Sequence, residues 1–575
     1  MSREHQLATS VLVVGTGGSG LRAAIELAES GVAVLAVGKR PVADAHTSLA
    51  AGGINAALAT TDPADSWEQH AADTLQESYL LADPRTVEIV TQGAARGIHD
   101  LERYGMRFNR DDEGSIAQRY FGAHTYRRTA FVGDYTGLAM QRALVDRAAQ
   151  LSVPVLSTVY VTQLLVHDGA VFGAYGFDLV DGSRYLIHAD AVILAAGGHT
   201  RIWRRTSSRR DENTGDSFRL AVEAGARLRD AELVQFHPSG LLEPEDAAGT
   251  LVSEAARGEG GVLLNNQGER FMQRYDAERM ELSTRDRVAL ASYTEIKEGR
   301  GTRHGGVWLD LSRLPRETIL TRLPRVYQTL LELQMLDITR DPIEVAPTAH
   351  YSMGGVWVRP ADHSTDVDGL FVVGEAASGL HGANRLGGNS LIELLVYGRL
   401  TGQAAREHSA RLGAQRRSAA AVTSARKTVD RLLAADGREN VRALQRAVRN
   451  LMTEYAGVVR DDSGLRAGLA ALDEIEERMT DVGVHPDIAG FQDLAHAFDL
   501  RSAVLAARAT MECALERRES RGCHNRSDYP SLDPNLQVNL VWSPETGVHS
   551  EAVPPIPTDI AALMHHVSAD GKLAE

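Results

Sequence analysis

Residues 11–20 read Val-Leu-Val-Val-Gly-Thr-Gly-Gly-Ser-Gly, and this stretch decides the fold class of the chain. The apolar run is typical of a buried strand, and the glycines that follow have the spacing Gly-x-Gly-x-x-Gly. Residues 21–28 then repeat apolar side chains at helical spacing. Glycines at such a turn let the backbone approach a pyrophosphate, and the helix N-terminus offers free N–H groups. The stretch therefore predicts a dinucleotide site formed by Gly15, Gly17, Gly18, Ser19 and Gly20.

The end of the next predicted strand, residues 32–37, indicates which dinucleotide is disfavoured. It is followed by Gly38-Lys39, where an NAD-binding unit would place an Asp or Glu for the ribose hydroxyl. Simple NAD binding is therefore disfavoured. The glycine pattern alone would also suit an ordinary loop, but the strand, turn, helix, strand order around it favours a cofactor site.

A lone histidine lies shortly downstream, in residues 44–55, Asp-Ala-His-Thr-Ser-Leu-Ala-Ala-Gly-Gly-Ile-Asn. Its position after a dinucleotide-binding start makes His46 a candidate covalent flavin anchor.

Composition limits the other possibilities. The chain has 575 residues, of which 43% are hydrophobic, so it can bury a large core divided among several domains. No run of eighteen apolar residues and no signal-peptide start is present, which predicts a cytoplasmic protein. The net charge of −15 argues against nucleic-acid binding. Because the only cysteines are Cys513 and Cys523, a four-thiolate iron–sulfur cluster would have to belong to a partner.

The hydrophobic pattern predicts an α/β fold in which a discontinuous Rossmann-like cofactor domain carries an insertion. Strands are expected within 155–180 and 185–196, a helix opens at Asp216, and the strand 369–374 leads to Glu375, whose carboxylate could bind a ribityl or ribose hydroxyl. The expected parts are cofactor domain 1–235 and 353–404, α+β capping domain 236–352, helical domain 405–515 and C-terminal region 516–575. Prolines predict an irregular tail after 530, and an apolar stripe at 465–479 is expected to be interhelical core.

Histidines and arginines gather in segments between the predicted domains. A single buried histidine is more often a satisfied core group than a ligand. Several that converge with arginines would instead form a cradle for carboxylates, since arginine offers a planar two-point contact. The expected substrate is a small dianion. The segments are Gln235–Pro238, Ser253–Gly261, Ser283–Asp286, Ala346–Tyr351 and His381–Asn389.

These motifs resemble the flavoprotein subunits of the succinate dehydrogenase and fumarate reductase family, and they are also similar to the related L-aspartate oxidases. The resemblance covers nearly the whole chain. Besides the glycine turn, it rests on His46-Thr47 with Gly52-Gly53, Phe121-Gly122, Gln235–Pro238, Glu254 with Arg257–Gly261, His350-Tyr351 with Met353–Gly355, Asn384–Leu386 and Glu519–Gly522.

The resemblance implies FAD bound covalently through His46 and chemistry on a four-carbon dicarboxylate. It assigns carboxylate binding to His237, Ser253, His350 and Arg385, with Phe121 beside the substrate. It makes Arg285 the proton donor or acceptor and Glu254 and Arg257 its relay. Further cofactor contacts fall on Lys39, Thr47, Gly52, Gly53, Asp216, Glu375, Ser390 and Leu391, and no metal site is implied.

The same resemblance implies membrane-anchor subunits and an iron–sulfur subunit of a quinone oxidoreductase, on the cytoplasmic side of a membrane. L-Aspartate oxidase remains the alternative, although such oxidases lack a histidine at the position of His46. A non-catalytic flavin protein is the remote alternative. Ala51 replaces the family's usual Gln or Glu, which leaves the direction of catalysis open, and Glu254 is the one carboxylate assigned near the cleft.

Overall fold

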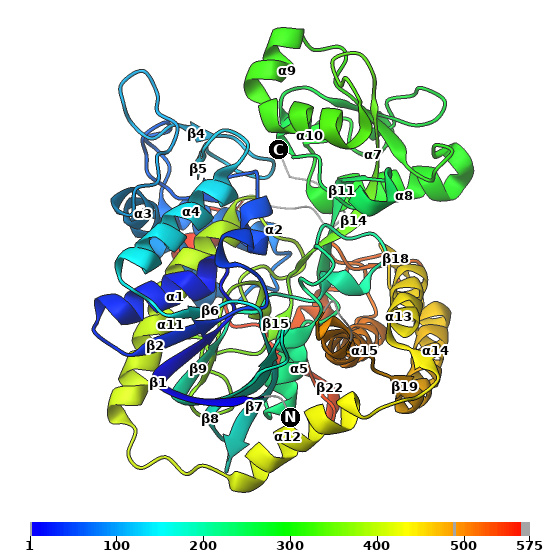
Figure 1. Cartoon of the computed structure of the whole chain (residues 1–575). Coiled ribbons are helices and arrows are strands. Elements are labelled where there is room, and N and C mark those ends of the chain that lie inside the picture. Colours follow the sequence, from blue (N-terminus) through cyan, green and yellow to red (C-terminus); the bar gives the residue numbers. More distant parts are fainter. Residues whose placement is uncertain (1–2, 487–489, 565–575) are drawn as a thin grey trace.

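The computed structural model describes residues 3–486 and 490–564, and its cofactor-binding part is built on one sheet (Figure 1). β1 (Glu4–Val14) lies parallel to β2 (Val34–Val37) on one side and to β9 (Arg184–Leu194) on the other. The strand order is β6-β2-β1-β9-β8-β7. The outer strands are β6 (Val155–Leu156), β7 (Val159–His167) and β8 (Ala170–Asp178). The α/β class predicted from residues 11–20 is confirmed.

The apolar run of β1 explains why the glycine turn is held in place. Val11 and Val13 are fully buried and share a core with Leu21 and Ile25 of α1 (Gly18–Glu29). Burying such a side chain contributes about 1.5–3 kcal/mol. α1 is packed in turn against α4 (Thr136–Gln150) and α11 (Asn389–Arg411). These contacts fix the N-terminus of α1 at the carboxyl end of β1.

The cofactor domain is discontinuous, as predicted. β9 pairs antiparallel with β8 near its start, and its last residues pair parallel with β16 (Leu370–Val372). A strand that follows the whole capping segment therefore completes the same sheet. α5 (Asp216–Glu223) begins at the predicted Asp216. α3 (Pro84–Arg103) packs against α2 (Trp67–Glu77) and α11, and α11 also contacts β3 (Ile54–Asn55), which forms a small sheet with β5 (Thr129–Ala130) and β4 (Gln118–Arg119).

The capping segment, green at the upper right of Figure 1, has its own antiparallel sheet and core. The strands run in the order β11 (Val234–Leu241), β14 (Ile343–Ser352), β13 (Val307–Asp310) and β12 (Val262–Leu264). The helices around them are α6 (Ala255–Gly258), α7 (Met272–Tyr275), α8 (Arg285–Glu295), α9 (Arg316–Arg322) and α10 (Pro324–Gln334). β11 and β14 also carry two of the histidines predicted to bind substrate, His237 and His350.

The helical part consists of α12 (Ala419–Leu433), α13 (Val441–Tyr455), α14 (Asp462–Arg478) and α15 (Gln492–Glu516). Leu465, Leu472 and Ile475 are buried in its core, so the predicted stripe is interhelical. The boundary predicted at 404/405 falls inside α11, and the helical part therefore begins after Arg411.

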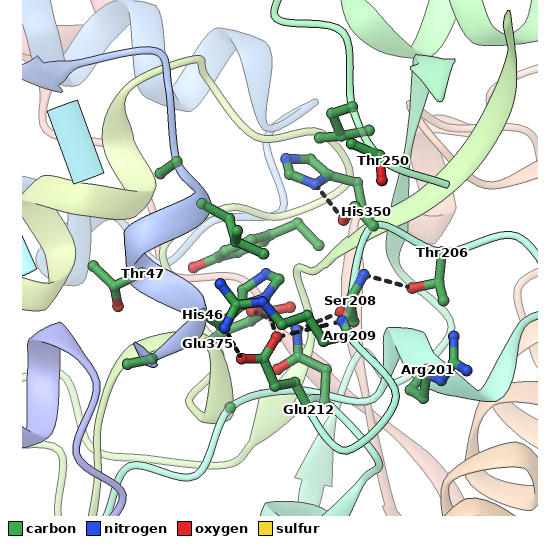
Figure 2. Close-up of a pocket in the computed structure, with 18 of the residues that line it drawn as sticks. His46, Thr47, Arg201, Thr206, Ser208, Arg209, Glu212, Thr250, His350 and Glu375 are labelled. Atoms are coloured by element: carbon green, nitrogen blue, oxygen red, sulfur yellow. Dashed lines mark hydrogen bonds and ion pairs between the residues drawn. The ribbon is translucent and has the colours of Figure 1, made fainter. Parts of the chain in front are cut away.

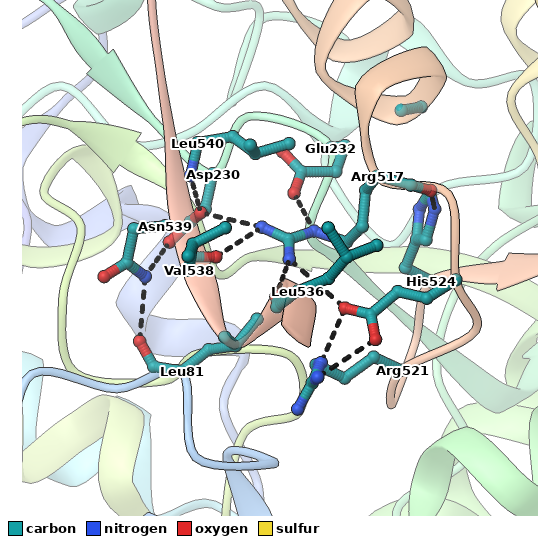
Figure 3. A network of polar contacts seen from close by, with 12 residues as sticks. Leu81, Asp230, Glu232, Arg517, Arg521, His524, Leu536, Val538, Asn539 and Leu540 are labelled. Carbon is teal, nitrogen blue, oxygen red and sulfur yellow. Dashed lines mark hydrogen bonds and ion pairs between the residues drawn. The ribbon is translucent and has the colours of Figure 1, made fainter. Parts of the chain in front are cut away.

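The segment after 530 differs from the irregular tail predicted from its prolines. β21 (Val538–Ser543) and β22 (Gly547–Ala552) form a hairpin, and β21 also pairs with β10 (Leu228–Arg229), beside β15 (Gly355–Val356). Figure 3 shows the buried polar network that includes residues of this strand. Arg517 lies 2.6 Å from Glu232 and 3.2 Å from Asp230, and it donates to the Val538 carbonyl. The charge pairing offsets the desolvation of these groups and joins α15 to the cofactor domain.

The other short elements of the described chain are β17 (Glu439–Asn440), β18 (Val459–Arg460), β19 (Val482–Gly483), β20 (Asn525–Arg526) and α16 (Thr558–Ala561). Within 3–486 and 490–564, none of the helices has the length and apolar character needed to span a membrane.

Candidate active site

A cavity of about 1530 Å³ lies between the carboxyl ends of the central strands and the capping domain, and Figure 2 shows part of it. It brings together nearly all the residues predicted from sequence. Those lining it are Gly15, Gly17, Gly18, Ser19, Lys39, His46, Thr47, Gly52, Gly53, Phe121, Asp216, His237, Ser253, Glu254, Arg285, His350, Glu375, Arg385, Ser390 and Leu391. Gly20 and Arg257 are not among the lining residues.

The glycine turn forms the cradle expected for a pyrophosphate. Gly15 has φ +116°, and a Cβ there would lie 2.1 Å from the Ala195 carbonyl oxygen. Gly17 caps α1 without any side-chain cap, while the Gly18 N–H donates to Thr47 Oγ1 at 3.0 Å. A Cβ on Gly20 would lie 2.0 Å from the Gly15 carbonyl oxygen, so Gly20 closes the turn rather than facing the cavity. The helix end is left open toward an anion.

Lys39 and Asp216, both predicted to contact the cofactor, bind each other. Lys39 Nζ lies 2.6 Å from Asp216 and 3.6 Å from Asp499. The hydroxyls of Tyr160 and Ser502 each donate to the other Asp216 oxygen at 2.8 Å. Burial opposes a charged lysine, but the two aspartates outweigh it and raise the pKa of Lys39. Lys39 and Asp216 therefore form an ion pair on the cavity wall.

His46 is oriented by a carboxylate that the sequence reading missed. Its Nδ1 lies 2.9 Å from Glu212, and Figure 2 shows the two side chains meeting inside the cavity. Arg209 and Arg40 lie 3.5 and 3.7 Å from the other Glu212 oxygen. Burial lowers the pKa of His46, but the Glu212 hydrogen bond outweighs it, and the net effect raises that pKa. Glu212 engages Nδ1 and leaves Nε2 as the ring nitrogen available to a ligand.

Glu375 and the start of α11 form another wall. The Glu375 carboxylate accepts from the Ser352 N–H at 3.0 Å and from Asn213 at 3.3 Å. Burial raises its pKa. Ser390 and Leu391 lie in the first turn of α11, where Ser390 accepts a hydrogen bond from Arg385 at 2.8 Å.

The two capping-domain histidines face each other with ring centroids 5.4 Å apart. Burial, followed by the charges of nearby arginines, holds the pKa values of His237 and His350 well below the usual 6.5, so both rings are neutral. His237 Nδ1 accepts the Ser239 N–H at 3.2 Å, which places the ring proton on Nε2. His350 Nδ1 lies 2.9 Å from Ser207 Oγ. The neutral His237 is thus a hydrogen-bond donor.

Arg285, Glu254 and Arg257 form a buried charged chain. Arg285 lies 2.6 Å from Glu254 Oε2, and Arg257 lies 3.9 Å from Oε1. Burial would raise the pKa of Glu254, but Arg285 and Arg257 lower it to about 2, so Glu254 is ionised. Arg257 stands behind Glu254, which explains its absence from the cavity wall, and its Nε and Nη2 have no hydrogen-bond partner within the described chain.

Arg385 stacks on Tyr351, with its guanidinium carbon 4.3 Å from the ring centroid. It donates to Gln235 Oε1 at 2.9 Å, and the same oxygen accepts from Arg285 at 3.2 Å. Its buried Nε has no partner among the described residues. Burial and the nearby Arg285 lower the pKa of Arg385 to about 10, which leaves it charged at neutral pH. An unpaired donor on a buried cation is suited to an anionic ligand.

Phe121 also lines the cavity, against Gly52. A Cβ on Gly52 would lie 3.2 Å from the Phe121 ring. Arg119 stacks on Phe121 and Phe131 and donates to the carbonyls of Gly52 and Ala51, the latter at 3.3 Å. The position of Ala51 is thus held through its backbone.

The comparisons with known proteins agree with this geometry. The family described as "FAD binding domain" matches residues 10–391, and "Fumarate reductase flavoprotein C-term" matches 445–556. The chain is 40% identical to one of the subunits of the fumarate reductase (CoM/CoB) of Methanothermobacter marburgensis, over 92% of this chain and 96% of that protein. It belongs to the succinate dehydrogenase and fumarate reductase flavoprotein family.

Two further relatives show how completely this flavoprotein matches the family. It is 36% identical to the succinate dehydrogenase flavoprotein subunit of Rickettsia bellii, over 93% of each chain. The solved structure of Mycobacterium smegmatis Sdh1 in complex with UQ1 superposes with a TM-score of 0.87 at 38% identity, over 96% of each chain. The flavoprotein is therefore an FAD-dependent oxidoreductase.

The cavity of the flavoprotein also contains charged residues that sequence reasoning did not assign. Carboxylates of the capping domain line it, so Glu254 is not alone: they are Glu243, Glu245 and Asp246. Arginines line the part near α13, namely Arg201, Arg204, Arg205, Arg210, Arg446 and Arg449. Five of the residues in 201–210 are arginines, so this cluster could have been recognised in the sequence. The three carboxylates resemble ordinary surface residues in the sequence and could not.

Proposed function

We propose that this flavoprotein interconverts succinate and fumarate as a subunit of a quinone oxidoreductase. The observation that carries the proposal is the convergence of two arginines, Arg285 and Arg385, and two neutral histidines at one end of the cavity. The only anion within ion-pair distance of Arg285 in the described chain is Glu254. The net positive wall matches a small dicarboxylate.

The residues present fit FAD. The open N-terminus of α1 and the glycine turn suit its pyrophosphate, and the cavity extends from this turn to the arginines. When bound, FAD supplies the site that accepts or returns a hydride.

Substrate binding is assigned to His237, Ser253, His350 and Arg385. Arg385 stacks on Tyr351 and offers an unpaired N–H to a carboxylate, and His237 offers its Nε2–H. Holding both carboxylates orients the carbon atoms for hydride transfer. Phe121, which also lines the cavity, excludes water from the bound substrate.

Proton transfer at the substrate carbon is assigned to Arg285. The adjacent Glu254 carboxylate, at 2.6 Å, takes up or returns the proton, and Arg257 exchanges it further. Because free arginine has a pKa above about 12, this role needs a neighbouring group that can exchange the proton, and Glu254 is in direct contact with Arg285. Fixed positive charge beside the carboxylates also stabilises the negative charge that develops at the carbon.

We also propose a covalent bond between His46 Nε2 and the flavin 8α carbon. The Glu212 contact at Nδ1 supports it, because it orients the ring and keeps that nitrogen occupied. A histidyl substituent withdraws electron density and raises the flavin potential, which suits the succinate/fumarate couple.

The proposed partners are membrane-anchor subunits and an iron–sulfur subunit, which would hold the flavoprotein on the cytoplasmic side of a membrane. Within the described chain, no group of His, Cys, Asp or Glu could hold a metal ion, and both cysteines are buried.

A basic surface beside the His46 end of the cavity could receive an acidic partner. Its arginines have no carboxylate within ion-pair distance among the described residues; they are Arg201, Arg204, Arg210, Arg446 and Arg449.

The deciding experiment is anaerobic mixing of the purified FAD-loaded protein with succinate, and of the reduced protein with fumarate. Flavin bleaching by succinate, reoxidation by fumarate, and inhibition of both by malonate are expected. If neither dicarboxylate changes the flavin spectrum, the proposed function fails and a non-catalytic flavin protein takes its place.

L-Aspartate oxidase is the second candidate, and one observation favours it. Glu243, Glu245 and Asp246 line the cavity and could pair with the ammonium group of aspartate. Flavin bleaching by L-aspartate that is faster than bleaching by succinate, with peroxide formed in air, would support the oxidase.

A further inference from the structure

Two carboxyl groups lie directly behind the substrate-facing arginines and share one amide. The Asn384 Nδ2 group donates to Glu77 Oε1 at 2.6 Å and to Asp286 Oδ1 at 2.9 Å. Asp286 follows Arg285 at the start of α8, and Glu77 ends α2. The Tyr79 hydroxyl donates to the second Asp286 oxygen at 2.7 Å. Neither carboxyl group belongs to the cavity wall.

The amide orientation of Asn384 is determined by its neighbours. Its Oδ1 accepts from Gln235 Nε2 at 2.8 Å and from the Cys523 thiol at 3.3 Å, so both groups at the oxygen are donors. Both groups at its nitrogen are carboxyl acceptors. The reversed amide would lose these contacts.

Gln235 then transmits this orientation to the active site. Its Nε2 is used by Asn384, so its Oε1 must face the arginines, and it accepts from Arg385 at 2.9 Å and from Arg285 at 3.2 Å. One carbonyl oxygen thereby sets the separation of two guanidinium groups that repel each other. A continuous chain of hydrogen bonds runs from the acid pair to both arginines.

Charge repulsion acts between the two acids. Burial, and then the charge of Asp286, raise the pKa of Glu77 well above 4.5, while Arg279 and Arg285 oppose the shift. Glu77 is therefore the member of the pair that holds a proton, next to the charge of Asp286. The charged or titratable groups that face the pair are Tyr79, Glu254, Arg279, Arg285 and Cys523.

We propose that Glu77 and Asp286 form an acid pair, bridged by the Asn384 amide, that positions Arg285 and Arg385 through Gln235 against the dicarboxylate. The role rests on the proposed function, because it is defined by a substrate with two carboxylates. With Glu77 protonated, the two carboxyl groups accept both Asn384 hydrogens and bear a single negative charge. When Glu77 also ionises, the two charges repel, Asn384 cannot hold both, and Gln235 loses its fixed partner.

Two substitutions separate positioning from simple structural support. Glu77→Gln keeps an oxygen for Asn384 but removes the titration, whereas Glu77→Ala removes the contact. Because small displacements of positioning groups cost up to about a hundredfold in rate, we expect Glu77→Ala to lower kcat/KM at pH 7 by about tenfold to a hundredfold. Glu77→Gln should restore most of that loss and should flatten the alkaline decline of kcat/KM. Glu68→Gln, about 13 Å away along the same helix, is the matched control.

A stability measurement tests the Glu77 proton without using turnover. Since the folded pKa of Glu77 is raised, the contribution of this one group to the stability of the parent is lost as pH rises above 4.5, and Glu77→Gln has no such contribution. The Tm of Glu77→Gln minus that of the parent should therefore increase from pH 5 to pH 8. A Tm difference that stays constant with pH would overturn the proposal. A kcat/KM of Glu77→Ala equal to that of the parent would also overturn it, as would equal losses of kcat/KM in Glu77→Ala and Glu77→Gln. If Glu77→Ala fails to fold, the Tm series and the pH profile of Glu77→Gln decide. Absence of turnover in the parent would defeat the proposed function but leave the Tm result valid.

Discussion

Arg285 and Glu254 are joined through a single carboxylate oxygen. Arg285 Nε and Nη2 lie 2.7 and 2.6 Å from Oε2, whereas Oε1 is left toward Arg257 at 3.9 Å. Each oxygen thus has its own arginine. In the proposed proton relay, one Glu254 oxygen therefore serves Arg285 and the other serves Arg257.

Removing the Glu254 charge should slow chemistry more than binding. Glu254→Gln leaves an amide beside Arg285 that cannot carry a proton. We expect kcat to fall by about a hundredfold, equivalent to about 2.7 kcal/mol, while malonate affinity changes little. Steady-state kinetics and a malonate titration of the flavin spectrum measure both. The exposed Glu278→Gln is the control, and a kcat within threefold of the parent would exclude the relay.

Arg285 and Arg385 should differ in the kinetic step that they support. Arg285→Gln should abolish turnover yet retain dicarboxylate binding, since its contribution is made in the transition state. Arg385→Gln should instead weaken malonate binding by about tenfold to a hundredfold, the loss of a charged hydrogen bond. Equal effects of both substitutions on binding would contradict the assignment.

The flavin link can be tested chemically. Acid-precipitated protein should retain flavin fluorescence, and His46→Ser should release the flavin while still binding FAD noncovalently. Glu212→Gln should reduce the covalent fraction, because the carboxylate orients His46 through Nδ1. Exposed His99→Ser is the matched control. Complete flavin release from the parent would remove the covalent proposal and strengthen the oxidase alternative.

Succinate and L-aspartate should be separated by charge. The ammonium group of aspartate would meet Arg285 and Arg385, and only Glu243, Glu245 and Asp246 offer carboxylates beyond the relay on the described capping wall. We expect succinate to bleach the flavin at least tenfold faster in stopped-flow mixing, because repulsion between like charges disfavours aspartate. The triple Gln variant of the three carboxylates should widen the difference if they pair with the ammonium.

Stability should decline on acidification because buried histidines are neutral. Burial lowers the pKa of His199 to about 3 and that of His124 to about 4. A group with a depressed folded pKa favours unfolding as pH falls below its unfolded value near 6.5. His199→Gln should therefore lessen the loss of stability below pH 6 by up to about 1.4 kcal/mol per pH unit. Denaturant unfolding between pH 4.5 and 7.5 measures it, and His99→Gln should match the parent slope.

Much of the fold and cavity follows from local sequence. The run Val11–Val14 and the glycines define a strand, a turn and a helix by sterics alone, and His46, His237 and Arg385 stand in distinctive motifs. The structure confirms the discontinuous α/β fold. The predicted site residues gather at one cavity, although their chemical roles remain proposals.

The rest depends on contacts between distant segments. Nothing near Glu212 indicates that it meets His46, and Lys39 meets Asp216 only after β2 and α5 approach. The hairpin of β21 and β22 is a local pairing that the surrounding prolines obscure, whereas the pairing of β21 with β10, a strand of two residues, joins segments far apart in the chain. Pairing across such separations leaves no local periodicity to read.

The Arg517 network has a consequence for synthesis on the ribosome. Its acidic partner Glu232 emerges 285 residues earlier, which at about 5–20 residues per second is about 15–60 seconds of translation. During that interval β10 has no β21 to pair with, and the carboxylate is held by water. The cavity wall itself spans Val14 to Thr453. Loading of the finished cofactor pocket therefore belongs to the end of translation or later, and a nascent chain would need protection for its unpaired strand edge until then.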